Sequence, residues 1–203
     1  MRLIASKVSA ALAAILILVG GATAQELSKV ERMEQQRFAK NNSLFVLYHE
    51  LGHLIFDQME LPILGREEDA ADNMASWILL TKRTPQAEAA LTDAARGWQL
   101  SGRAYNSGGY DSDFYAAHSL DRQRSFQIVC LMVGSNVGAF RPIANQYRMD
   151  RDRQDSCYFD WETVDRSLRG LLGVGRKAKH VGTEVVVTYH EVGGRLKTAA
   201  NAF

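Results

Sequence analysis

The sequence predicts a mainly α-helical protein of the α+β class, with a small β element at its C-terminal end. Two observations favour this class. Apolar residues recur at the spacing of one helix face through most of the chain between residues 27 and 170. A single run, residues 184–189, is instead rich in Val and Thr and favours a strand, with a hairpin closing through Gly193-Gly194.

The composition is that of one globular domain with almost no net charge. The chain has 203 residues, 46% of them hydrophobic, and a formal net charge of +1. This length suits a single domain. Because the charges nearly balance, there is no electrostatic reason to expect binding to nucleic acid or to an anionic membrane surface. The sequence predicts no oligomeric state.

The first residues have the features of a secretory signal peptide. A positively charged start precedes an apolar run at residues 8–19, and Ala22-Thr23-Ala24 offers small residues for cleavage. A retained membrane anchor is the alternative, but a dozen apolar residues are fewer than the roughly 20 that span a bilayer. We therefore predict a signal peptide at residues 1–24 and one domain at residues 25–203. The mature protein would be periplasmic or secreted and would not be held in a membrane.

Export bears on the two cysteines, Cys130 and Cys157. In an oxidising compartment an even number of cysteines favours a disulfide. The alternative is two free buried thiols. We predict the bridge, which would tie a helix to the segment that follows Pro142.

The helices are expected at intervals set by capping residues and loop residues. Asn41-Asn42-Ser43 predicts a break between the first two of them. The expected helices are residues 27–40, 44–59, 67–81, 85–100 and 120–133, with one or two more within 141–170. The expected loops are residues 61–65 and 101–113.

The stretch His49-Glu50-Leu51-Gly52-His53 has the spacing of a metal-binding helix. Two histidines four residues apart lie on one face, so both imidazoles can reach one ion, and zinc accepts such nitrogens. Glu50 points in a neighbouring direction and can act as general base on a metal-bound water. An ordinary core helix is the alternative, but it would bury polar groups without partners at a cost in free energy.

A third ligand is expected from the acidic start of the next helix. Glu68 and Asp72 are four residues apart and share a face. We predict Glu68 as the ligand and Asp72 as the acceptor for the second N–H of a ligand histidine. Glu67 is the alternative ligand. Otherwise Glu67 and Asp69 stabilise the first turn of their own helix.

These motifs resemble a bacterial family of metallopeptidases of unknown detailed function. The similarity rests on residues 47–53, on the stretch from Leu61 to Asp72 that includes Gly65-Arg66-Glu67-Glu68-Asp69, and on residues 118–124 with Cys130. The spacing of Glu68 and Asp72 is also that of the second motif of gluzincins. The resemblance implies a zincin-like pair of metal-binding helices, a zinc cofactor and a peptide or protein substrate.

Several other residues are candidates for the reaction itself. A zinc peptidase needs a group that stabilises an oxyanion, and His118, Tyr110 and Tyr115 are of suitable types. We predict His118 as the catalytic one. The alternative is that His118 caps a helix or contacts Asp121 and Arg124. Arg124 itself favours a structural ion pair.

Two functions remain open from the sequence. The first is an exported zinc-dependent peptidase in which Glu50 takes a proton from the attacking water. The second is a non-catalytic periplasmic binding or interaction module that retains its metal. In zincins a sheet ahead of the metal helix lines the substrate cleft, whereas only residues 25–43 separate the predicted signal from that helix here.

Overall fold

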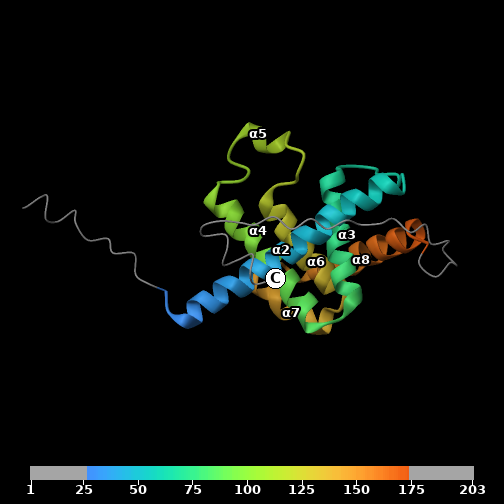
Figure 1. Ribbon diagram of the computed structural model, residues 1–203. Helices are drawn as coiled ribbons and strands as arrows, with labels where there is room; N and C mark the ends of the chain where they lie inside the picture. The colour runs from blue at the N-terminus through green and yellow to red at the C-terminus, as the bar shows by residue number, and fades with distance from the viewer. Residues whose placement is uncertain (1–26, 174–203) are drawn as a thin grey trace, which may run out of the picture. The chain divides into compact units, whose positions relative to one another are not determined.

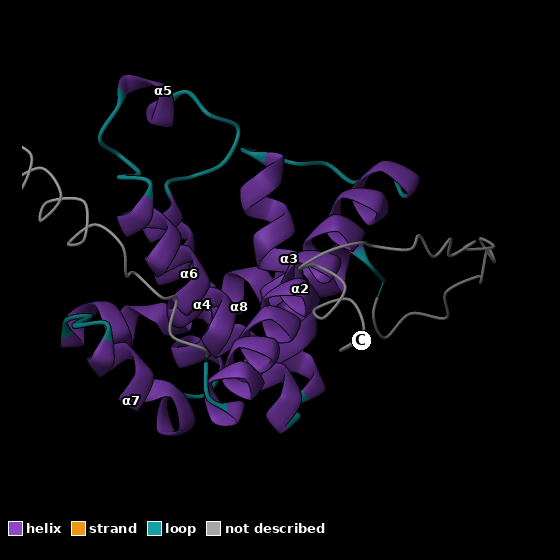
Figure 2. Cartoon of the chain, turned by 60° about the vertical axis from the view of Figure 1, so that its left-hand side comes forward, coloured by secondary structure: helices purple, strands orange, loops and turns teal. Residues whose placement is uncertain are grey.

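A computed structural model describes residues 27–173. Figure 2 shows only helices and loops in this part of the chain, which confirms the mainly helical prediction. The α+β class is wrong for the described residues, because the apolar pattern keeps the helical period and no strand forms between residues 27 and 173. The class rested on residues 184–189 alone. These residues and the expected signal peptide, residues 1–24, lie outside the described part.

The chain divides into two compact units after Glu34. In the first unit, Ser28 and Glu31 form a reciprocal pair of hydrogen bonds. The Ser28 hydroxyl accepts from the Glu31 amide at 3.2 Å, and the Glu31 carboxylate accepts from the Ser28 amide at 2.8 Å. This capping box begins α2 (Lys29–Gln58).

Seven helices follow one another through residues 27–173 (Figure 1). The break between α7 and α8 agrees with the expectation of two helices in that region. The expected loop at residues 101–113 is shorter in the structure, because α4 continues to Ala104 and the short α5 begins at Asp111. None of the helices among these residues has the length and apolar content that would let it cross a membrane. The helices are α2 (Lys29–Gln58), α3 (Glu67–Lys82), α4 (Pro85–Ala104), α5 (Asp111–Phe114), α6 (Asp121–Ser135), α7 (Val137–Gln146) and α8 (Arg151–Leu171).

The predicted break at Asn41-Asn42-Ser43 is wrong, because α2 continues through these residues. Asn41 is buried, and its amide donates to Asp93 at 2.6 Å and accepts from Gln86 at 2.9 Å. The Asn42 amide donates to the Phe38 carbonyl at 2.8 Å within the helix. Asparagine ends helices when its side chain competes for the local backbone. Here the partners of Asn41 lie on α4, so the backbone stays helical.

Helix α6 is the centre of the second unit, and α3, α4, α7 and α8 pack against it. Its residues from Ile128 to Val133 are all buried, so the helix is apolar on every side over nearly two turns. A second, smaller core cluster forms where α2, α3 and α8 meet, around Phe56, Met74 and Leu168.

The predicted disulfide is present and joins α6 to α8 through Cys130 and Cys157. The two helices approach closely beside it. A methyl group added at Gly134 would come within 2.1 Å of the Cys157 carbonyl oxygen. Glycine is therefore required there by the contact between the helices.

Candidate metal centre

Glycine in the motif lets the metal helix and the following helix approach each other. Gly52 is buried on α2, and a methyl group at this position would lie 3.3 Å from the Cα atom of Ala71 on α3. The short connection between the two helices leaves them side by side. As a result, the acidic first turn of α3 faces the histidines of α2.

Three donor atoms converge between these helices. The Nε2 atom of His49 lies 3.1 Å from the Oε2 atom of Glu68 and 3.2 Å from the Nε2 atom of His53. The Nε2 atom of His53 lies 3.4 Å from the same Oε2 atom. We call these three atoms the donor triangle. The structure thus brings together the three residues that were predicted as metal ligands.

The donor triangle has the size that a tetrahedral zinc ion requires. With metal–ligand bonds of about 2.0–2.1 Å, the ligand atoms of a tetrahedron lie about 3.3–3.4 Å apart. Each histidine has a carboxylate within hydrogen-bond distance of its Nδ1 atom. With the proton of the neutral ring assigned to Nδ1, the Nε2 lone pairs are directed towards each other and towards the Glu68 carboxylate. Converging lone pairs repel unless a cation lies among them. Two imidazoles and one carboxylate are also a donor set that zinc prefers.

Asp72 holds the buried member of the triangle in place. The Nδ1 atom of His49 donates to Asp72 at 2.9 Å, and Arg124 donates to both oxygens of the same carboxylate at 2.7 and 2.9 Å. Burial raises the pKa of Asp72, but the hydrogen bonds from Arg124 and His49 outweigh burial, and the pKa lies below its usual value. The Arg124 guanidinium also stacks on Trp98, 3.5 Å from the ring centroid. Arg124 therefore forms a buried structural ion pair.

Glu67 has a corresponding contact with His53 that the sequence analysis did not anticipate. Its carboxylate accepts from the Nδ1 atom of His53 at 2.8 Å. This hydrogen bond is the main reason why the pKa of His53 is raised; burial acts in the opposite direction, and the charges of Glu68, Glu67 and Glu50 add to the increase. Ligand histidines usually donate their second N–H to a carboxylate or carbonyl, so two such histidines call for two acceptors. This rule was the signal by which the role of Glu67 could have been predicted from the sequence.

His118 lies on the open side of the donor triangle. Its Nε2 atom is 2.7 Å from the Oε2 atom of Glu68, and its ring is stacked with that of His49 at a centroid distance of 6.2 Å. The side chain of His49 is 7% exposed, whereas that of His118 is 45% exposed. The contacts therefore extend from the buried His49 to His118 at the solvent. The alternative partners of His118 have other contacts: the Asp121 carboxylate accepts from Ser101, and Arg124 pairs with Asp72.

The remaining candidates are exposed. Glu50 lies on α2 next to the buried His49, and its charge acts on His53 as described above. Tyr110 and Tyr115 lie on the loop around α5, with 62% and 81% of their surfaces exposed. In the described part of the chain neither tyrosine has a hydrogen bond to the donor triangle. Among the described residues, His118 is the predicted catalytic side chain that contacts Glu68.

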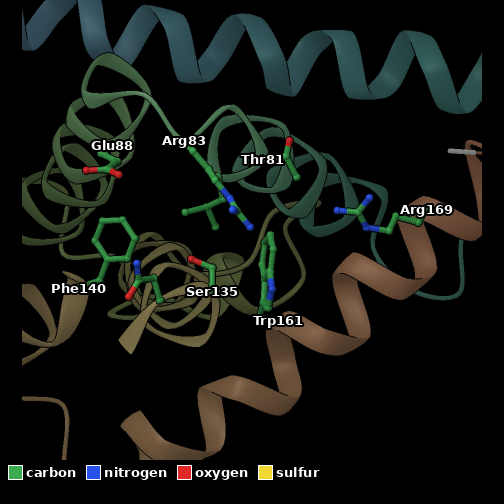
Figure 3. A pocket seen from close by; sticks show the side chains of 9 residues that line it. Thr81, Arg83, Glu88, Ser135, Phe140, Trp161 and Arg169 are labelled. Atoms are coloured by element: carbon green, nitrogen blue, oxygen red, sulfur yellow. The ribbon is translucent and has the colours of Figure 1, made fainter. Parts of the chain in front are cut away.

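A cavity of about 570 Å³ lies elsewhere in the second unit (Figure 3). Figure 3 shows the side chains of Arg83 and Trp161 directed into it. Its walls come from the end of α3, the start of α4, the junction of α6 with α7, and α8. None of the predicted site residues lines this cavity, so it is separate from the donor triangle.

The sequence of the chain matches a known protein family. Residues 16–172 match the model of a family described as "Putative metallopeptidase". The chain belongs to this family. The match covers more than half of the sequence and includes α2, α3 and α6, which carry the donor triangle and Arg124. No curated protein and no solved structure matches the chain. Membership of this metallopeptidase family indicates a metal and a peptide or protein substrate.

Proposed function

We propose that the protein is an exported, zinc-dependent peptidase whose metal is held by His49, His53 and Glu68. The observation that carries the proposal is the donor triangle, with sides of 3.1, 3.2 and 3.4 Å. A zinc ion with three protein ligands supplies Lewis acidity and lowers the pKa of water to about 7. Family membership supports the same class of reaction.

The residues around the triangle have distinct parts in this proposal. Asp72 and Glu67 orient the two imidazoles, so that the Nε2 atoms would be free to hold the metal. The Glu50 carboxylate accepts a proton from the attacking water and passes it to the leaving amine. His118, on the solvent side of Glu68, donates from its ring to the oxyanion of the substrate.

Export is part of the proposal. The apolar run and small residues within residues 1–24 support a cleaved signal peptide. The disulfide between Cys130 and Cys157 supports an oxidising destination, because disulfides persist in the periplasm and outside the cell.

Substitution of the proposed base separates metal binding from turnover. We expect Glu50→Gln to keep its zinc and to lose peptidase activity, because the amide cannot accept the proton. His53→Ala should lose zinc as well. The zinc content of protein purified without added metal, together with digestion of a peptide library with and without chelator, measures both effects.

The control for charge removal is Glu162→Gln, on the exposed surface of α8. This variant should keep both zinc and activity. Full activity of Glu50→Gln would overturn the proposed mechanism, and a wild-type protein that binds no zinc would overturn the proposed metal centre.

A second candidate function is a non-catalytic module that binds a partner and keeps the metal for stability. It is favoured by the purely helical structure of residues 27–173, because zincins pair their peptide substrates with a strand. Full zinc occupancy without chelator-sensitive cleavage in the same peptide digest would support this function over the peptidase.

A further inference from the structure

The guanidinium of Arg66 is hydrogen-bonded to the segment between α4 and α6, which carries His118 and is called the loop below. Its Nη1 atom donates to the His118 carbonyl oxygen at 3.1 Å and to the Ser119 hydroxyl at 3.4 Å. Its Nη2 atom donates to the Phe114 carbonyl oxygen at 3.4 Å. Among the described residues Arg66 forms no ion pair. Its charge is therefore directed at the backbone of this loop.

A second hydrogen bond supports the same attachment. The Ser119 hydroxyl donates to Asp69 on α3 at 2.8 Å. Arg66 precedes α3 directly, and its side chain makes no capping hydrogen bond to that helix. The start of α3 therefore holds the loop at two points, on either side of the ligand candidate Glu68.

The loop needs these polar contacts because apolar packing does little to fix it. Tyr105, Tyr110, Phe114 and Tyr115 are all more than 60% exposed. Few buried contacts leave a loop free to move at little cost in free energy. The position of the His118 ring over Glu68 therefore depends on the attachment of its backbone to α3.

We propose that Arg66 is a positioning residue that acts through His118. By binding the His118 carbonyl it holds the imidazole where its Nε2 atom reaches Glu68 at 2.7 Å. Its effect on turnover rests on the proposed peptidase function. Its effect on the His118 ring does not, and this separates the two tests.

The first test observes the ring directly, in the metal-free protein. Imidazole ¹H–¹⁵N spectra are recorded for wild type, Arg66→Ala and Arg66→Lys. The His118 signals in Arg66→Ala should move towards those of a fully solvent-exposed histidine, and the signals of His49, on which the His118 ring stacks, should shift with them. Arg66→Lys should fall between, because one ammonium cannot span both carbonyls as the planar guanidinium does.

The matched control is Arg151→Ala, at an exposed position where α8 begins. It should leave all histidine signals unchanged. Far-ultraviolet circular dichroism establishes that each variant is folded, and Arg66→Lys provides the reading if Arg66→Ala does not fold. Unchanged His118 signals in the folded Arg66 variants would overturn the proposal.

The second test is a double-mutant cycle on turnover. Arg66→Ala should lower kcat roughly tenfold or more and leave KM within about twofold, since loss of an oxyanion donor costs about 10²–10³ in kcat. In a His118→Ala background the same substitution should have no further effect. An equal loss in both backgrounds would mean that Arg66 acts by another route. If the wild type cleaves no peptide, the peptidase proposal fails while the spectra still decide the role of Arg66.

Discussion

Each of the two histidines on α2 donates a hydrogen bond to an acidic residue of α3. Asp72 accepts from His49 in the core, and Glu67 accepts from His53 near the surface. The two acids differ in what holds them, because Asp72 is buried against Arg124 whereas Glu67 is exposed. The orientation of His53 therefore depends on one hydrogen bond that water can reach.

That difference gives a prediction for Glu67. We expect Glu67→Ala to weaken zinc binding roughly 10–100-fold, since the loss of a residue that orients a ligand histidine has effects of this size. Competition with a chromophoric chelator measures the dissociation constant. Glu88→Ala, exposed on α4, serves as control and should bind zinc as wild type does. An unchanged affinity in Glu67→Ala would show that His53 is oriented by something else.

The sequence predicted the residues of the donor triangle because their spacing is local. His49 and His53 lie one helical turn apart, and Glu68 lies in the first turn of the next helix. The sequence could not predict the contacts of Arg66 with the loop, since its partners lie about 50 residues further along the chain. Nothing in the neighbourhood of Arg66 indicates which loop it will meet.

The same contrast applies to whole helices. The expected helix at residues 67–81 agrees closely with α3, because an acidic start and a periodic apolar face specify it locally. The expected break near residue 42 failed, because the partners of Asn41 lie on α4. Distant tertiary contacts can override a local helix signal, and only the folded chain supplies them.

Helices α3 and α8 are joined by a small polar cluster on the edge of the second core. The Trp77 indole donates to Asp165 at 2.7 Å, and Arg169 donates to both oxygens of Asp165 at 2.8 Å. Burial raises the pKa of Asp165, but the bonds from Arg169 and Trp77 outweigh it, and the pKa lies below its usual value. Ionised Asp165 therefore stabilises the packing of α8 on α3.

The lowered pKa of Asp165 sets the pH range in which its contribution to the free energy of unfolding is lost. At neutral pH Asp165→Asn should reduce the free energy of unfolding, by about 1 kcal/mol or less because the site is partly solvated. As pH falls through the folded-state pKa, wild-type Asp165 becomes protonated and the difference should vanish. Urea unfolding at several pH values from 7 to below 4 measures it. Asp155→Asn, at a more exposed ion pair, should change less. A difference that persists at the lowest pH would contradict the assignment.

On the scale of the whole molecule, the disulfide is a covalent constraint on the second unit. The bridge joins two cysteines that are 27 residues apart in the chain, and α7 lies in the loop that it closes between α6 and α8. A cross-link of this length lowers the entropy of the unfolded chain by an amount worth about 3–4 kcal/mol.

Reduction should therefore lower the free energy of unfolding by about 3–4 kcal/mol. Urea unfolding with and without a phosphine reductant measures the change. The double variant Cys130→Ala/Cys157→Ala should be insensitive to the reductant, which controls for its other effects. Equal stability of the oxidised and reduced wild type would show that the bridge adds nothing to the folded state.

The positions of the site residues along the chain set an order of assembly. Contacts within the donor triangle and to Asp72 span at most 23 residues, whereas those of Arg124 and Arg66 to their partners span 48 to 53. Closing the longer loops costs roughly 0.9 kcal/mol more in chain entropy than closing the 19-residue separation of His49 and Glu68. The last residue of the triangle, Glu68, precedes His118 by 50 residues in the chain. The contacts between α2 and α3 can therefore form before the loop that carries His118 has been made.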